Sequence, residues 1–252
     1  MIRGIDSFRE WFEGYENQYV IIGGTACDLI MSNEGLDFRA TKDIDMVLII
    51  EMINYEFGKK LWKYITSAGY EHKNKSDGMP QFYRFTNPKS KEFPFMIELF
   101  SRRPNMLFLP KEAILTPLPI DEGISSLSAI LLNEDYYAFL KNGRIQIDGV
   151  TILDAPYLIP FKAKAWLDLS ARKARGEKVD SKNIRKHKND VFRLTELLNR
   201  DMQMSGQMSD AVHKDMSYFI EQMKHEEIDL KQLKIRGKTK EEILSDLAKI
   251  YL

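Results

Sequence analysis

Residues 20–45 read VIIGGTACDLIMSNEGLDFRATKDID, and no other stretch of the sequence carries so distinct a pattern of apolar, glycine and acidic residues. The apolar run Tyr19–Ile22 ends at a diglycine, which predicts a buried strand followed at once by a helix over about 25–31. Asp43–Ile50 is apolar and β-branched after an acidic start, which predicts a central strand. Side chains two apart on a strand point to the same face, so we expect Asp43 and Asp45 to be neighbours.

The diglycine, followed along the chain by Asp43 and Asp45, suggests a particular chemistry. Two adjacent carboxylates repel each other and favour a bound divalent cation, and oxygen ligands suit Mg²⁺. A diglycine at a strand–helix junction lets a phosphate approach the backbone, and the helix N-terminus offers free N–H groups. Each feature alone is common, since such a junction is usually only a tight turn. Together they predict a site for a metal-chelated polyphosphate.

At these residues the sequence resembles the nucleotidyltransferases of the DNA polymerase β superfamily, whose signature is apolar-Gly-[Gly/Ser], a helix, then Asp-x-[Asp/Glu]. It is more closely similar to the abortive-infection AbiEii-type nucleotidyltransferase toxins, which share Gly-Gly-Thr-Ala (23–26) and Arg-x-Thr-x-Asp-x-Asp (39–45). Eighteen residues separate Gly24 from Asp43, more than the usual spacing, so residues 32–38 are interpreted as an inserted loop. The resemblance covers roughly residues 18–200.

The pattern predicts a mixed α/β (α+β) domain over residues 1–155 and a helical C-terminal domain over 156–252. The resemblance implies that the first domain has the nucleotidyltransferase fold with a mixed sheet. It also implies an enzyme that transfers a nucleoside monophosphate from an NTP to a hydroxyl acceptor with Mg²⁺ or Mn²⁺. The implied catalytic and metal-binding residues are Asp43, Asp45 and Glu98, and the implied nucleotide-binding residues are Gly23, Gly24, Thr25 and Arg39.

Glu98 is the candidate for the third carboxylate of the superfamily, on a strand beside the one that carries Asp43 and Asp45. A carboxylate in the middle of an apolar strand is costly to bury without a partner, so its place needs a reason. The alternative is an edge strand whose Glu98 face meets water. Glu51, Glu92 and Asp148 are weaker rivals, because each lies at a strand end or in a turn.

The resemblance further implies a triphosphate-binding lysine on the helix after the core, followed by a basic helix that carries Asp190. Either Lys162 or Lys164 fits this place. The two side chains lie about 200° apart around a helix, so only one is expected to face the site. An ordinary solvated helix face is the alternative for each.

Other elements follow from local signals. Ser7 and Glu10 form a capping-box pattern, Gly69 is a predicted helix C-cap, and Asp148-Gly149 predicts a hairpin turn. Residues 107–119, with three prolines, predict a surface connection. The other predicted strands are 81–85, 93–100, 145–147 and 150–153, and the predicted C-terminal helices are 161–175, 181–200, about 209–224 and 239–251, the last with a second capping box.

The composition sets the remaining expectations. The 37 basic and 37 acidic residues balance, yet residues 172–193 hold nine Lys or Arg against three acids. This local charge suggests RNA or tRNA as the acceptor, and a solvated helix face is the alternative. One cysteine and the absence of a long apolar run predict a cytoplasmic protein with no membrane partner. The resemblance implies a toxin with an antitoxin partner; the other function considered is a catalytically inactive nucleotide-binding or protein-interaction module of the same fold.

Overall fold

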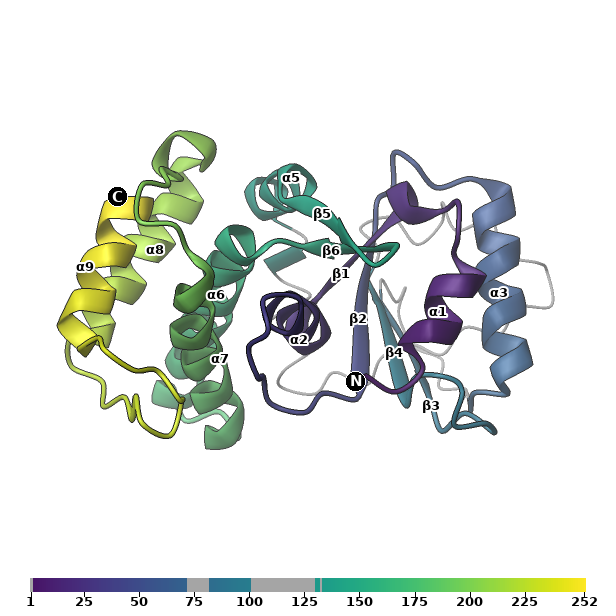
Figure 1. Cartoon of the computed structure of the whole chain (residues 1–252), viewed down its shortest axis with the longest axis horizontal. Coiled ribbons are helices and arrows are strands. Elements are labelled where there is room, and N and C mark those ends of the chain that lie inside the picture. The colour runs from purple at the N-terminus through teal and green to yellow at the C-terminus, as the bar shows by residue number, and fades with distance from the viewer. Residues whose placement is uncertain (1, 72–81, 101–129, 132) are drawn as a thin grey trace. The chain divides into compact units, whose positions relative to one another are not determined.

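The computed structural model describes residues 2–71, 82–100, 130–131 and 133–252. These residues form eight α-helices and a six-stranded mixed sheet, so the predicted α+β class is confirmed (Figure 1). The predicted surface connection over 107–119 lies outside the described residues. Within the described ranges, no helix has both the length and the apolar character needed to cross a membrane.

The chain divides into two compact units. The sheet unit holds the described residues between 2 and 100 together with 144–153, and the helical unit holds those between 130 and 143 together with 154–252. The hairpin over 144–153 therefore leaves the helical unit and returns to it. Its two ends are joined within the helical unit, because the N–H of Asp154 donates to the carbonyl of Gly143 at 2.9 Å.

The sheet has the strand order β3-β4-β2-β1-β6-β5. Its central strand β1 is antiparallel to β2 and parallel to β6, and β2 is parallel to β4. The Asp-Gly hairpin is confirmed, with φ of 47° at Asp148 and 73° at Gly149, as a primed turn requires. The strands are β1 (Tyr19–Ile22), β2 (Asp43–Leu48), β3 (Phe82–Thr86), β4 (Met96–Phe100), β5 (Arg144–Ile147) and β6 (Val150–Leu153).

Three helices belong to the sheet unit: α1 (Ile5–Trp11), α2 (Gly23–Asn33) and α3 (Tyr55–Ala68). In Figure 1, α2 lies on one side of the sheet, and α1 and α3 lie on the other. The predicted C-cap at Gly69 is confirmed with a φ of 61°. The predicted capping box at Ser7 is wrong: α1 begins after Gly4 in the left-handed conformation, and the Ser7 hydroxyl donates to the Gly4 carbonyl instead.

The helical unit contains α5 (Glu134–Asn142), α6 (Ala155–Ala174), α7 (Ser181–Leu194), α8 (Asp210–Met223) and α9 (Lys240–Tyr251). Three differences from the prediction stand out. Helix α5 was not predicted, α6 begins at Ala155 with Pro160 inside it, and α7 ends at Leu194. The capping box of α9, between Thr239 and Glu242, is confirmed in both directions.

Candidate functional site

The junction between β1 and α2 is tighter than predicted, because the helix begins at Gly23 itself. The φ of Gly23 is 72°, a left-handed value that favours glycine. Ile22 precedes it as the N-cap and supplies no side-chain cap. The N–H groups of the first turn therefore lie at a helix N-terminus with its positive dipole end, which is a favourable place for an anion.

Both glycines lie against side chains of the second segment. A Cβ atom added to Gly23 would lie 1.8 Å from Oδ2 of Asp45, and one added to Gly24 would lie 3.1 Å from Nη2 of Arg39. The first distance means that any side chain at residue 23 would displace the Asp45 carboxylate from its present position. The structure thus brings the predicted phosphate-binding turn into direct contact with the predicted metal-binding carboxylate.

Thr25 links the first turn of α2 to the segment that leads into β2. Its hydroxyl, which is fully buried, donates to the backbone carbonyl of Asp43 at 2.6 Å. Since this bond uses the only hydroxyl proton of Thr25, the Thr41 hydroxyl is the donor in the 2.9 Å bond between the two threonines. Two partly buried hydrogen bonds therefore fix the start of β2 against the first turn of α2.

The three predicted carboxylates lie on neighbouring strands. Asp43 and Asp45 are half-buried, two residues apart on β2. Glu98 on β4 is directly opposite Asp45 in the parallel pairing. Side chains of such register partners lie on the same face of a sheet, with the strands about 4.8 Å apart. The alternative of an edge strand for Glu98 is wrong, since β4 lies between β3 and β2 and Glu98 is 7% exposed.

Glu98 has a partner that the sequence analysis missed. Arg84 on β3 is the register partner of Glu98. Its Nε and Nη2 atoms lie 2.8 Å and 2.5 Å from the same carboxylate oxygen, Oε1. A lone cation within the strand sequence Phe82–Thr86 was the available signal, of the same kind that drew attention to Glu98.

The donor set can be compared with the needs of Mg²⁺. Within the ranges that the structure describes, no three or more His, Cys, Asp or Glu residues form a group that could hold a metal ion. Mg²⁺ in proteins is usually bound through one or two carboxylates, with phosphates and water completing its coordination. The pair Asp43 and Asp45 fits this mode for an ion shared with a nucleotide, whereas a ligand set that includes Glu98 is not assembled.

The Arg39 guanidinium group lies next to Gly24 of the diglycine. It also lies 5.1 Å from the centre of the Phe38 ring. Burial raises the pKa of Asp28 on α2, and the charge of Arg39 partly opposes that rise. Arg39 thus brings a positive charge to the N-terminal half of α2, close to where a phosphate would lie.

The two candidate lysines belong to the helical unit and have different surroundings. Lys162 is buried and its Nζ lies 2.8 Å from Oδ2 of Asp190. Lys164 is more exposed and lies 3.5 Å from Asp168 and 3.2 Å from Asp215. Asp215 also accepts a hydrogen bond from the Tyr136 hydroxyl at 3.0 Å. Both lysines are therefore engaged by carboxylates of their own unit.

The basic segment over 172–193 is partly neutralised within the helical unit. Arg172 and Arg175 both lie against Glu177, at 2.7 Å and 2.9 Å. Lys188 and Arg193 are also ion-paired, with Glu226 and Glu196. The basic residues that are exposed at the start of α7 and just before it are Lys178, Lys182, Arg185 and Lys186.

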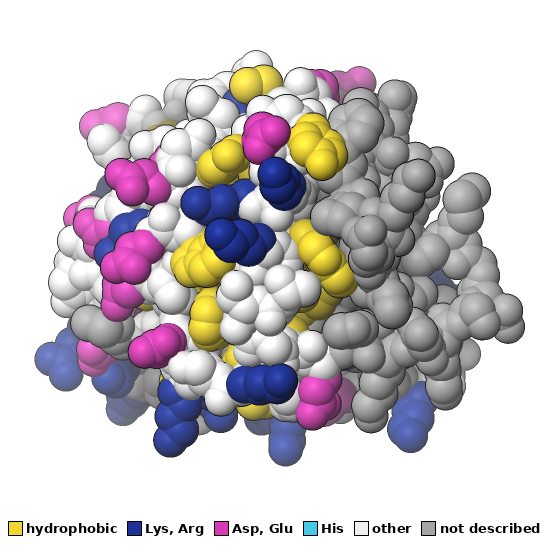
Figure 2. All heavy atoms as spheres, turned by 90° about the vertical axis from the view of Figure 1, so that its right-hand side faces the viewer, with side chains coloured by type: hydrophobic (Ala, Val, Ile, Leu, Met, Phe, Trp, Pro, Cys, Tyr) yellow, Lys and Arg dark blue, Asp and Glu magenta, His cyan; other side chains and the backbone are white. Residues whose placement is uncertain are grey.

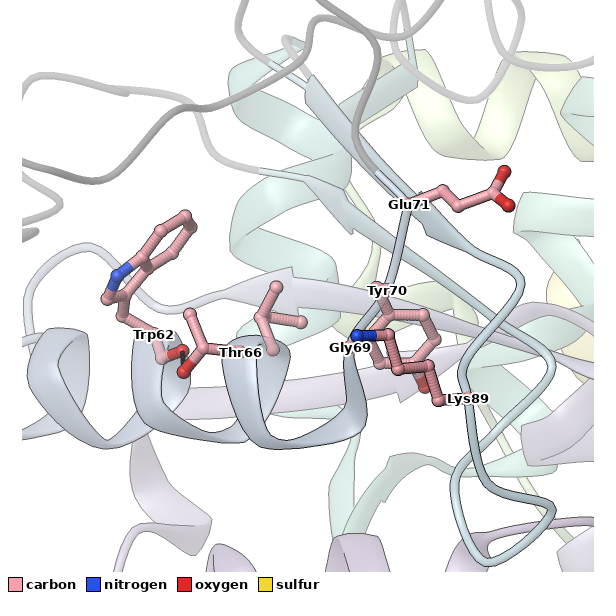
Figure 3. Close-up of a pocket in the computed structure, with 7 residues that line it drawn as sticks. Trp62, Thr66, Gly69, Tyr70, Glu71 and Lys89 are labelled. Atoms are coloured by element: carbon pink, nitrogen blue, oxygen red, sulfur yellow. Dashed lines mark hydrogen bonds between the residues drawn. The ribbon is translucent and has the colours of Figure 1, made fainter.

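Two other surface features of the sheet unit have fewer groups that could act on a ligand. A pocket of about 510 Å³ at the end of α3 is lined by Trp62, Ile65, Thr66, Gly69, Tyr70, Glu71 and Lys89 (Figure 3). Several of its polar groups are turned to internal partners; Glu71, for example, accepts from the Asn87 amide at 2.9 Å. Figure 2 shows basic and hydrophobic side chains together on the α3 side, where Lys60 and Lys63 lie within 6 Å of the Trp11 ring.

No family model, no curated protein and no solved structure matches the chain. A function must therefore be argued from the geometry of the sheet unit, where seven of the nine predicted site residues lie. Asp45 meets Gly23, Arg39 meets Gly24, Thr25 binds the backbone of Asp43, and Glu98 is opposite Asp45.

Proposed function

We propose that this chain is a Mg²⁺-dependent nucleotidyltransferase, related in its site to the DNA polymerase β superfamily and to the AbiEii-type toxins. One observation carries the proposal: the Asp45 carboxylate lies against Gly23 at the N-terminus of α2, where an added Cβ would displace it. This contact joins an anion-binding turn to a carboxylate pair. A metal-chelated triphosphate is the ligand that needs both at once.

Each residue has a role in this proposal. The backbone N–H groups at Gly23 and Gly24 bind phosphate oxygens, and Arg39 adds positive charge beside them. Asp43 and Asp45 hold Mg²⁺, and Glu98 is the third carboxylate. From the resemblance alone, Lys162 or Lys164 is the proposed triphosphate-binding lysine. When bound, Mg²⁺ supplies charge neutralisation on the phosphates and lowers the pKa of the attacking hydroxyl.

The reaction is an in-line displacement at phosphorus. The acceptor oxygen forms a bond to the α-phosphorus, and the bond from that phosphorus to the bridging oxygen of the β-phosphate breaks. Pyrophosphate leaves with the bonding electron pair, and the hydroxyl proton passes to water. The two hydrogen bonds of the Thr25 hydroxyl contribute by keeping the phosphate-binding turn and the carboxylates from moving apart.

For the acceptor we propose RNA or tRNA, which the exposed basic side chains at the start of α7 favour. A protein or small-molecule hydroxyl is the alternative acceptor. We also propose, from the resemblance alone, a cytoplasmic toxin that is neutralised by an antitoxin protein.

A catalytically inactive nucleotide-binding module is the second candidate, and one observation favours it. Glu98 is ion-paired with Arg84, and no group of three metal-binding side chains is found in the described ranges. In this case the chain would bind a nucleotide with Mg²⁺ and transfer nothing.

Incubation with each labelled NTP, Mg²⁺ and cellular RNA or protein separates these functions. We expect label in the RNA fraction, and its loss in Asp45→Asn, because the carboxamide is a far weaker Mg²⁺ ligand. The matched control is Asp148→Asn, which removes one carboxylate of the same unit from a turn that also accepts asparagine. Calorimetry with a non-hydrolysable NTP analogue and Mn²⁺ gives the binding readout. Equal affinity in wild type and Asp45→Asn would refute both candidates.

A further inference from the structure

The outer face of helix α3 in the sheet unit carries three lysines within five residues, Lys59, Lys60 and Lys63. The opposite face is apolar and buried, with Phe57 and Leu61 among its residues. Residues four apart are neighbours on a helix surface, so Lys59 and Lys63 lie side by side, and both are exposed. Basic and hydrophobic side chains gather on this side of the unit (Figure 2). Helix α3 is therefore fixed to the core by one face and presents positive charge on the other.

Aromatic side chains lie beside these lysines. Nζ of Lys60 and Nζ of Lys63 lie 5.7 Å and 5.9 Å from the centre of the Trp11 ring, within the range of a cation–π contact. The Trp11 ring is half-buried and makes an edge contact with buried Tyr64, whose ring centre is 5.4 Å away. Tyr55, about one turn before the lysines, is 54% exposed. The α3 surface, as we call this group, consists of Trp11, Tyr55, Lys59, Lys60 and Lys63.

The lysines of the α3 surface are not neutralised by a neighbouring carboxylate. In the ranges that the structure describes, none of the three forms a salt bridge, although Glu10 and Glu13 are exposed on the neighbouring segment. Several cations of residues 172–193, by contrast, are ion-paired. The positive charge of the α3 surface is therefore open to an anionic ligand.

We propose that the α3 surface binds single-stranded RNA. Lysine side chains are flexible, so their ammonium groups can reach phosphates while bases stack on the rings of Trp11 and Tyr55. A membrane is not favoured, because the apolar face of α3 is already buried in the core. An acidic peptide matches the charge but has no bases to stack on the rings. The proposal rests on the proposed function in one respect, the choice of RNA as the acceptor.

The position of the α3 surface decides what it contributes. Helix α3 and helix α2 lie on opposite sides of the sheet (Figure 1). The α3 surface therefore holds a part of the RNA that is remote from the reacting hydroxyl. Its loss should weaken the binding of RNA and leave the binding of the Mn²⁺–nucleotide complex unchanged.

The test is the fluorescence anisotropy of labelled oligouridylate with the full chain, measured over a range of salt concentrations. Replacing the three lysines of the α3 surface by Gln should flatten the slope of log affinity against log salt by about 2, at about 0.7 per phosphate contact. The matched control is Lys214→Gln/Lys231→Gln/Lys249→Gln, which removes the same charge from exposed positions of the helical unit and should keep the wild-type slope.

The aromatic rings are tested separately. Tyr55→Ala and Trp11→Leu should each weaken RNA binding by about 5- to 150-fold, the effect of losing one stacked base. The salt slope should not change, because stacking releases no counterions. Trp11→Phe keeps a ring and should retain most of the affinity. If circular dichroism shows that Trp11→Leu does not fold, Tyr55→Ala at its exposed position decides this part of the test.

Three results overturn the inference: a wild-type salt slope in the lysine variant, an equal flattening in the control variant, or equal wild-type affinity for oligoglutamate and oligouridylate. Wild-type RNA affinity in folded Tyr55→Ala and Trp11→Leu also overturns it. If Asp45→Asn still weakens binding of the Mn²⁺–nucleotide complex in any of these cases, only the inference fails. If Asp45→Asn binds that complex like wild type, the proposed function fails, whatever the result with RNA.

Discussion

The two units of this protein differ in how their charged side chains are grouped and paired. The sheet unit gathers three carboxylates on β2 and β4, next to a glycine turn, with a single arginine on the adjoining strand. Charged side chains in the helical unit form ion pairs, and in the pair of Lys162 with Asp190 both side chains are buried. Matched buried pairs are a common structural device, whereas an excess of one sign beside open backbone groups indicates a ligand site.

The largest expected effect is on the buried pair of the helical unit. Asp190→Asn leaves the Lys162 ammonium without its charge partner, so we expect the free energy of unfolding to fall by about 3–5 kcal/mol. The double variant Lys162→Met/Asp190→Leu should recover most of that loss, because it buries no charge. Chemical denaturation followed by circular dichroism measures both.

The control for this prediction is Lys224→Gln, which breaks the exposed pair with Glu221 and should change the unfolding free energy little. A Lys162→Met variant that keeps its stability but loses nucleotide binding would contradict the assignment of a purely structural role to the Lys162–Asp190 pair. It would make Lys162 a ligand-binding residue, as the resemblance implied.

The second expected effect concerns the glycine turn of the sheet unit. Gly23→Ala places a Cβ where Asp45 Oδ2 now lies, so the carboxylate must move. Because a displacement of about 1 Å can cost 100-fold in rate, we expect at least about a 100-fold loss of nucleotidyl transfer. Labelled-NTP transfer and binding of the Mn²⁺–nucleotide complex are the measurements.

Gly35→Ala is a matched control for Gly23→Ala. Gly35 has a similar φ of 69° but nothing within 4 Å of an added Cβ. Both variants carry the same left-handed backbone cost, about 1–2 kcal/mol, and only Gly23→Ala meets a carboxylate. Equal activities in the two variants would mean that the Asp45 contact does not matter for the site.

The smallest expected effect concerns Asp168 in the helical unit. Here, as in the sheet unit, two carboxylates lie close together, because Asp168 and Asp215 both pair with Lys164. Burial raises the pKa of Asp168 above its ordinary 3.8, and Lys164 partly opposes the rise. The folded state therefore binds this proton more tightly than the unfolded state does. As a result, the contribution of Asp168 to stability falls as pH rises through 3.8 toward the folded pKa.

Asp168→Asn removes this pH-dependent loss of stability, and Lys164 keeps Asp215 as its partner. The melting temperature of the variant relative to wild type should rise between pH 3.5 and pH 7, by a small amount, and thermal melts across this range measure it. A relative melting temperature that falls with pH would show that the pair with Lys164 outweighs burial.

Much of the fold follows from local signals in the sequence. The diglycine after Tyr19–Ile22, the Asp-Gly turn and the capping box at Thr239 each act within a few residues. The turn and the capping box form as predicted, and the strand before the diglycine is followed by a helix that begins at Gly23, two residues earlier than predicted. The prediction at Ser7 failed because Gly4, in the left-handed conformation, starts the helix earlier. The helix predicted over 161–175 begins six residues earlier, at Ala155, because Asp154 supplies an N-cap and the helix contains Pro160.

The residues of the candidate site likewise fall into those that a local sequence pattern predicts and those that it does not. Gly23 and the two aspartates of β2 were found because they belong to one short pattern. Arg84 could not be assigned to Glu98 from the sequence, because that pairing depends on the register of β3 against β4, and a slip of one residue would turn Arg84 to the other face. Interactions set by register between strands need the folded sheet.

The return of the hairpin to the sheet has a consequence during protein synthesis. β1 is an edge strand until β6 pairs with it, and the partners Ile21 and Ile152 lie about 130 residues apart. At a synthesis rate of about 5–20 residues per second, the ribosome needs roughly 7–26 s to reach β6 after making β1. For that time the buried strand of the proposed site has an open edge, which is a template for pairing with another chain. Fragments that end before residue 150 are therefore expected to aggregate, whereas the full chain closes its own sheet.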